Sequence, residues 1–241
     1  MGRAHQVRAA SIAKTAAMKS KIYSRFGKEL YVAAKTGVPD PEMNLTLKRK
    51  IAEAKANQVP AAVIDRAIEK AKGTTVENYT VNRYEGFGPG ASTLIIDCLT
   101  DNVNRTITEI KTCFNKAKAK LGVLGSVSFN YNELGILSFT YDDEEKMLEA
   151  LIEADVELED IELEDGIMTV YVNSSDFHKA QDAIEELIKD VNFDVCKIAM
   201  LPNEYIQLTD EEEIETFNRL IDMLNDVEDV QHIYHNVEID E

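Results

Sequence analysis

The fold of this chain is decided by residues 135–201, which read GILSFTYDDEEKMLEALIEADVELEDIELEDGIMTVYVNSSDFHKAQDAIEELIKDVNFDVCKIAML. Segments with strand character alternate here with segments whose apolar residues have helical spacing. Strands are expected at 135–141, 158–163, 167–172 and 195–201, and helices at 144–154 and 174–189. Glu164-Asp165-Gly166 predicts a tight turn between the two middle strands. The order is βαββαβ, the ferredoxin-like unit, and we predict that residues 133–204 form one such domain.

Incomplete α/β pieces lie on both sides of this domain. The first piece is expected to contain strands at 79–87 and 91–99, a helix from 101 to about 121, and a strand at 126–131. The last piece contains a helix at 210–224, opened by the capping box Thr209-x-x-Glu212, and a strand at 230–234. Neither piece has enough strands and helices for a complete domain, whereas the two together can form a single sheet with helices on one face. We therefore predict that residues 76–132 and 205–241 fold together, with the ferredoxin-like domain inserted between them.

Residues 1–75 have a purely helical pattern. We expect helices at 21–36, 44–57 and 60–73. Pro39-Asp40-Pro41 separates the first two, because proline lacks an amide donor and restricts the residue before it. The expected fold class is therefore α+β, with an N-terminal three-helix domain followed by two α/β domains of ferredoxin-like character, one inserted in the other.

The net charge of the chain changes sign near residue 73, where the purely helical pattern ends. Residues 1–73 contain 15 Lys and Arg against 6 Asp and Glu, a net charge of +9, and residues 74–241 contain 11 against 38, a net charge of −27. The basic part can attract polyanions, whereas the acidic part repels them and is left to contact a protein partner. No apolar run is long enough to span a membrane, and the three cysteines form no CxxC pair. These features predict a reduced, cytoplasmic protein without a membrane partner.

The first long helix has its cations on one side. A step of seven residues rotates an α-helix by only about 20°, so cations at this spacing form a stripe. The stripe consists of Lys14, Lys21, Lys28 and Lys35, with Arg25 beside it. The other side, expected to pack on the bundle, carries Ile22, Phe26, Leu30 and Ala33. Such a row suits the regularly spaced phosphates of nucleic acid, although an ordinary solvated helix face has the same pattern.

Two basic groups extend this interface. Arg3 and Arg8 continue the charge toward the N-terminus, and Lys48-Arg49-Lys50 lies on the next helix with Lys55. No set of side chains that reads base edges stands out, so only phosphate contact is predicted.

The sequence indicates no motif for nucleotide binding, metal binding or catalysis. Gly86-x-Gly88-x-Gly90 has the wrong spacing for a nucleotide loop and precedes a strand, so it predicts a tight turn or a docking loop. The polar cluster Thr100–Thr106 either caps a helix or forms a polar site beside the glycine loop. Its members are Asp101, Asn102, Asn104 and Arg105. His232 and His235 are three residues apart on a strand, which places them on opposite faces. We therefore expect no enzyme, no cofactor and no metal.

Several of these segments resemble the YebC/PmpR family, and most closely its YeeN-type branch. The resemblance rests on Ser20–Tyr23 with Phe26-Gly27, Arg83–Gly90, Leu99–Thr106, Gly125–Phe129 and Val230–Asn236. It implies a helical N-terminal domain and two α/β domains, one inserted in the other. It also implies a cytoplasmic DNA-binding regulator of transcription. Mitochondrial relatives are translational activators, so RNA or the ribosome is the alternative target.

The N-terminus departs from the pattern of that family. Relatives typically carry a tryptophan there, whereas this chain has no tryptophan and His5 stands near that place. The expected nucleic-acid contacts are thus Arg3, His5, Arg8, Lys14, Lys21, Arg25, Lys28, Lys35, Lys48, Arg49 and Lys50.

Overall fold

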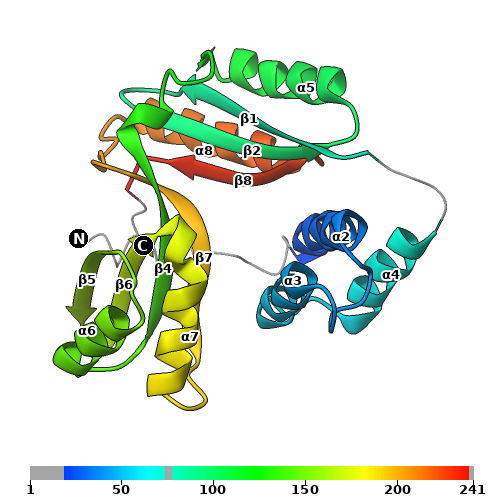
Figure 1. Cartoon of the computed structure of the whole chain (residues 1–241). Coiled ribbons are helices and arrows are strands. Elements are labelled where there is room, and N and C mark those ends of the chain that lie inside the picture. Colours follow the sequence, from blue (N-terminus) through cyan, green and yellow to red (C-terminus); the bar gives the residue numbers. More distant parts are fainter. Residues whose placement is uncertain (1–18, 74–77, 239–241) are drawn as a thin grey trace. The chain divides into compact units, whose positions relative to one another are not determined.

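The structure is a computed structural model that describes residues 19–73 and 78–238 (Figure 1). The described residues form two compact units. The first contains those of 15–127 and 208–235, and the second those of 128–207 and 236–238. The fold class is α+β, as the sequence predicts.

The first unit begins with a bundle of three helices. They are α2 (Lys19–Thr36), α3 (Leu45–Ala56) and α4 (Ala61–Lys72). Asn44 caps α3, because its Oδ1 accepts a hydrogen bond from the Leu47 amide at 3.0 Å. Pro60 stands immediately before α4, where its missing amide donor costs no helical hydrogen bond. The three predicted helices are confirmed.

A four-stranded antiparallel sheet completes the first unit. It contains β1 (Thr80–Phe87), β2 (Thr93–Thr100), β3 (Lys120–Leu121) and β8 (Val230–His235), in the order β3-β1-β2-β8. In the pairing of β2 with β8, Ile96 lies opposite Ile233. Helices α5 (Val103–Lys116) and α8 (Glu211–Asp226) pack against each other beside the sheet. The C-terminal helix and strand therefore join the sheet that starts at Thr80.

Two element predictions in this region are wrong. The helix expected to reach residue 121 ends at Lys116, and Lys118 then adopts a φ of 53° as the chain turns into β3. The strand expected at 126–131 is a 3₁₀ turn, η2 (Ser128–Asn130). The reason lies in Glu85, whose buried carboxylate accepts hydrogen bonds from the amides of Gly125 at 2.9 Å and Val127 at 2.6 Å. Because these amides donate to the Glu85 side chain, they cannot donate to a neighbouring strand.

The second unit has the predicted βαββαβ order. Its elements are β4 (Tyr131–Thr140), α6 (Glu144–Glu153), β5 (Leu158–Glu164), β6 (Ile167–Asn173), η3 (Ser174–Asp176), α7 (Phe177–Leu187) and β7 (Phe193–Pro202). The strands form an antiparallel sheet in the order β5-β6-β4-β7. Asp165 and Gly166 have φ values of 53° and 77°, the positive values that a two-residue hairpin turn requires. The core includes Leu137, Phe139 and Met147.

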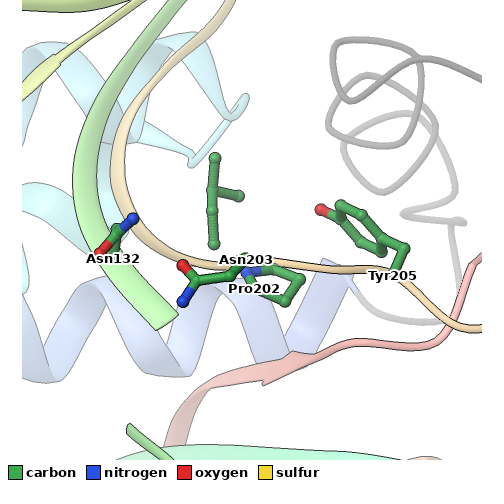
Figure 2. Close-up of a pocket in the computed structure, with 5 residues that line it drawn as sticks. Asn132, Pro202, Asn203 and Tyr205 are labelled. Carbon is green, nitrogen blue, oxygen red and sulfur yellow. The ribbon is translucent and has the colours of Figure 1, made fainter. Parts of the chain in front are cut away.

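A shallow hollow lies where β4 begins and β7 ends (Figure 2). It has a volume of about 230 Å³ and is lined by Asn132, Leu201, Pro202, Asn203 and Tyr205. None of these five side chains is cationic, so the hollow offers a phosphate no counter-charge. Within the part of the chain that the structure describes, no helix could cross a lipid bilayer.

Candidate nucleic-acid interface

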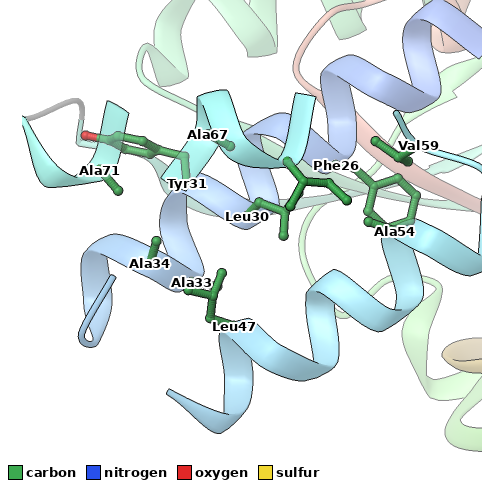
Figure 3. Packing of buried hydrophobic residues seen from close by; sticks show 11 residues of the cluster. Phe26, Leu30, Tyr31, Ala33, Ala34, Leu47, Ala54, Val59, Ala67 and Ala71 are labelled. Carbon is green, nitrogen blue, oxygen red and sulfur yellow. The ribbon is translucent and has the colours of Figure 1, made fainter. Parts of the chain in front are cut away.

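Helix α2 packs its apolar face into the bundle (Figure 3). Phe26, Leu30 and Ala33 are buried against side chains of α3 and α4 that include Leu47 and Ala67. Helix geometry thus places the apolar and cationic residues of α2 on different faces, as the spacing of these residues predicts.

The cationic face of α2 meets the last turn of α8 and the short connection from α8 to β8. We call residues Asn225–Asp229, which span this stretch, the acidic turn. Lys21 forms an ion pair with Asp226, and Arg25 Nη2 donates to Asn225 Oδ1 at 3.0 Å. The Lys28 ammonium lies 2.9 Å from Asp229 Oδ1 and 3.5 Å from Glu228 Oε1. Three successive cations of the stripe are therefore engaged by one short segment of the same chain.

Asp229 is the central acceptor of this contact. Its side chain is 1% exposed, and besides Lys28 it accepts from Arg105 Nη2 at 2.8 Å and from Thr100 Oγ1 at 3.0 Å, with Thr106 Oγ1 at 2.8 Å. Burial favours the protonated acid, but the hydrogen bonds from Arg105, Lys28 and the two threonines outweigh it. They lower the pKa of Asp229 to about 2. Asp229 is therefore ionised at neutral pH.

A second ionic cluster joins α2, α3 and β8. Lys50 lies 2.9 Å from Glu29 and 2.6 Å from Glu53, and His232 Nε2 lies 3.7 Å from Glu29. Burial opposes ionisation of Glu29, but His232 and Lys50 lower the pKa of this carboxyl to about 2. Lys50 thus neutralises carboxylates within the bundle.

The expectation of a free cationic row along α2 is wrong for its described members. Lys21, Arg25 and Lys28 are bound by the acidic turn, and Lys35 donates to the carbonyls of Ala71 and Gly73, both at 3.1 Å. Helical periodicity gives the face on which these cations lie but not what covers that face. The expected contacts Arg3, His5, Arg8 and Lys14 lie outside the described residues.

Cations of α3 and α4 remain accessible. The Lys48 side chain is 58% exposed and only loosely paired with Glu42 at 3.4 Å, and Lys55 and Arg66 are exposed. Lys48 and Lys55 are seven residues apart, which places them on one stripe of α3. Arg49 is half-buried. Exposed positive charge of the bundle therefore lies on α3, whereas the sequence analysis placed the main row of cations on α2.

The glycine loop and the polar cluster are at opposite ends of the β1–β2 hairpin. Phe87 pairs with Thr93 at the glycine end, and Thr80 pairs with Thr100 at the other. A polar site beside the glycine loop is therefore wrong, because an antiparallel pair of eight-residue strands separates the two. Gly86 lies within β1, one residue before the strand ends, and a Cβ there would lie 2.3 Å from the Phe114 ring.

The polar cluster has the capping role that the sequence left open. Asn102 Oδ1 accepts from the Arg105 amide at 3.1 Å and so caps α5. Arg105 also donates to Asp101 at 2.7 Å, and the carbonyl of Asn104 accepts from Thr108 Oγ1. Asn102 and Arg105 thus fix the start of α5, and Arg105 extends from there to Asp229.

Two family models together match most of the chain. One, described as the TACO1/YebC protein N-terminal domain, matches residues 3–74, and the other, described as the TACO1/YebC second and third domain, matches residues 79–237. The chain belongs to the TACO1/YebC family. The N-terminal match coincides with the basic part of this TACO1/YebC chain, and the second match with the acidic part.

Relatives align with this family member over almost its full length. A "Probable transcriptional regulatory protein" of Pseudoalteromonas translucida is 50% identical over 98% of both chains, and one of Vibrio campbellii is 48% identical over 99% of this chain and all of the relative. The crystal structure of a conserved hypothetical protein from Aquifex aeolicus is 31% identical. It superposes with a TM-score of 0.76 over 95% of this chain and 94% of that one.

Sequence reasoning missed the residues that hold this TACO1/YebC chain's α2 in place. Asp229, Glu29 and His232 were not singled out for this role, although Asp229 has the largest number of polar partners described here. The only local signal for Asp229 is its position between α8 and β8.

Proposed function

We propose that this chain is a nucleic-acid-binding regulatory protein whose helical domain contacts phosphates, and that it regulates transcription by binding DNA. The observation that carries the proposal is the separation of charge. A small helical domain with a net charge of +9 precedes α/β domains with a net charge of −27. Such a molecule attracts a polyanion through its helical domain and repels it from the rest of the chain.

The accessible cations of α3 support phosphate contact. Lys48 and Lys55 share a stripe and are exposed, so both ammonium groups can release counterions from a nucleic-acid backbone. Relatives that are 47–50% identical carry the name "Probable transcriptional regulatory protein", which agrees with a DNA target. We include Arg3, Arg8 and Lys14 in the proposed contact because they continue the positive charge of the basic part toward the N-terminus.

Regulation of translation is the second candidate. Phosphate contact through a lysine stripe carries no base readout, and it serves a folded RNA as well as a DNA duplex. The resemblance to a family whose mitochondrial relatives are translational activators favours a folded RNA or the ribosome as the target of this second candidate.

The test is a salt titration of binding. Fluorescence anisotropy of a labelled DNA duplex and a labelled RNA hairpin is measured for the wild type and for Lys48→Ala with Lys55→Ala. If both lysines meet phosphates, log K against log salt becomes shallower by about 2, because each phosphate contributes about 0.9 on B-DNA. The matched control is Lys146→Ala with Lys179→Ala, which removes the same charge from exposed positions of the second unit.

Each outcome has a definite meaning. Tighter binding of the duplex supports a regulator of transcription, and tighter binding of the hairpin supports a regulator of translation. An equal loss in the control pair would contradict the assignment to α3, and an absence of binding to both probes would contradict the proposed function.

A further inference from the structure

The contact between α2 and the acidic turn is polar throughout the interactions described. The buried core of the helical bundle is made of side chains between Phe26 and Ala71, and among the described hydrophobic residues Tyr79 is the one beyond the bundle that packs on it. Across to α8 and β8 the described contacts are ion pairs and hydrogen bonds of Lys21, Arg25, Lys28 and Glu29. Interfaces of this kind separate readily, because little apolar surface is exposed when they open.

Packing at this contact is incomplete. A cavity of about 120 Å³ lies between the two elements, lined by Lys21, Ser24 and Arg25 from α2 and by Asn225–Glu228 and Val230. Arg25 is half-buried there, and its described hydrogen bond is to a neutral amide, that of Asn225. A guanidinium in this position gains more from a phosphate, which accepts two parallel hydrogen bonds, than from one amide oxygen.

Asp229 stays hydrogen-bonded when α2 moves away from the acidic turn. Asp229 keeps Arg105, Thr100 and Thr106 as partners without any contribution from the helical domain. Asp226 and Glu228 are 71% and 78% exposed, and they are rehydrated easily once their lysines leave. Opening the contact therefore leaves no buried charge without a partner on the α/β side.

We propose that the acidic turn is an internal competitor of nucleic acid: it occupies the phosphate-binding positions Lys21, Arg25 and Lys28, and nucleic acid must displace it. The inference rests on the proposed function and adds that the protein has a closed and an open state. In the closed state the acidic turn holds Lys21, Arg25 and Lys28 of α2, and binding starts from α3. In the open state the three cations of α2 join the contact.

The first test weakens the turn without touching the helical domain. Asp226→Asn with Glu228→Gln removes two exposed carboxylates, and Asp229 is left in place. We expect the affinity for a labelled DNA duplex or RNA hairpin to rise by about fivefold, the combined equilibrium value of the two exposed ion pairs that are lost. The matched control is Glu212→Gln with Glu215→Gln, which removes the same charge from exposed positions near the start of α8.

The control separates competition from general charge. An equal rise in both double variants would overturn the internal competitor, because any loss of acid would then suffice. If no form binds either probe, the proposed function fails and the competitor with it. Binding by the wild type with no gain in the Asp226 and Glu228 variant overturns the competitor alone.

The second test closes the contact covalently. Ser24→Cys with Asn225→Cys places two thiols on the same cavity, in a Cys196→Ser background because Cys98 and Cys113 are buried. After treatment with a short bismaleimide we expect binding at least tenfold weaker than in the untreated protein. Equal binding before and after crosslinking, or failure of the two thiols to be linked, would contradict the closed state.

Discussion

Asp229→Asn removes the buried charge that binds Lys28 and Arg105 while keeping the shape of the side chain. In the wild type the pKa of Asp229 is about 2, against about 3.9 for an ordinary aspartate. A difference of about two pKa units corresponds to about 2.5 kcal/mol by which the fold favours the ionised form. The amide also places N–H donors near Arg105 and Lys28, so we expect the free energy of unfolding to fall by about 3 kcal/mol at pH 7.

Urea denaturation of both proteins from pH 7 to pH 2 measures this effect. The pKa of Asp229 is depressed in the folded state, so its stabilisation is complete above the unfolded value near pH 4 and is lost as the pH falls toward 2. The difference between wild type and variant should therefore shrink by about 2.5 kcal/mol over this range. Asp226→Asn is the control, and as a 71% exposed partner it should cost about 1 kcal/mol or less. A difference for Asp229→Asn that is below 1 kcal/mol, or constant with pH, would refute the account of this acid.

Three further substitutions test the scaffold. Gly86→Ala should lower the melting temperature by several degrees and the free energy of unfolding by about 2 kcal/mol, since its Cβ would lie 2.3 Å from the Phe114 ring, and an unchanged melting curve would contradict this packing. Glu85→Ala leaves the amides of Gly125 and Val127 without their buried acceptor, so limited proteolysis should cut between residues 122 and 127 faster than in the wild type, and equal rates would disprove its role. Asn44→Ala should cost about 1 kcal/mol in urea denaturation through loss of the α3 cap, whereas a neutral effect would show that the cap is dispensable.

The parts of the fold that the sequence predicts well are those fixed by local geometry. The ferredoxin-like unit follows from alternating strands, two amphipathic helices and the turn at Asp165-Gly166, all of which act within a few residues. The division of α2 into an apolar face with Phe26 and Leu30 and a cationic face with Lys28 follows from helical rotation alone.

The parts that the sequence does not predict depend on residues far apart in the chain. Lys28 and Asp229 are separated by 201 positions, and no spacing rule connects them. The strand expected at 126–131 is wrong for the same reason, because the Glu85 carboxylate that captures the Val127 amide is 42 positions away. Local charge patterns show what a helix can bind, whereas tertiary contacts decide what it does bind.

The most direct test is to crosslink the protein to nucleic acid in living cells with ultraviolet light, then to identify the attached peptides by mass spectrometry and the attached nucleic acid by sequencing. A polyanion binds where positive charge is concentrated, so we expect the attached peptides to come from residues 1–73. Attachment confined to residues 79–237, or no attached nucleic acid at all, would contradict it.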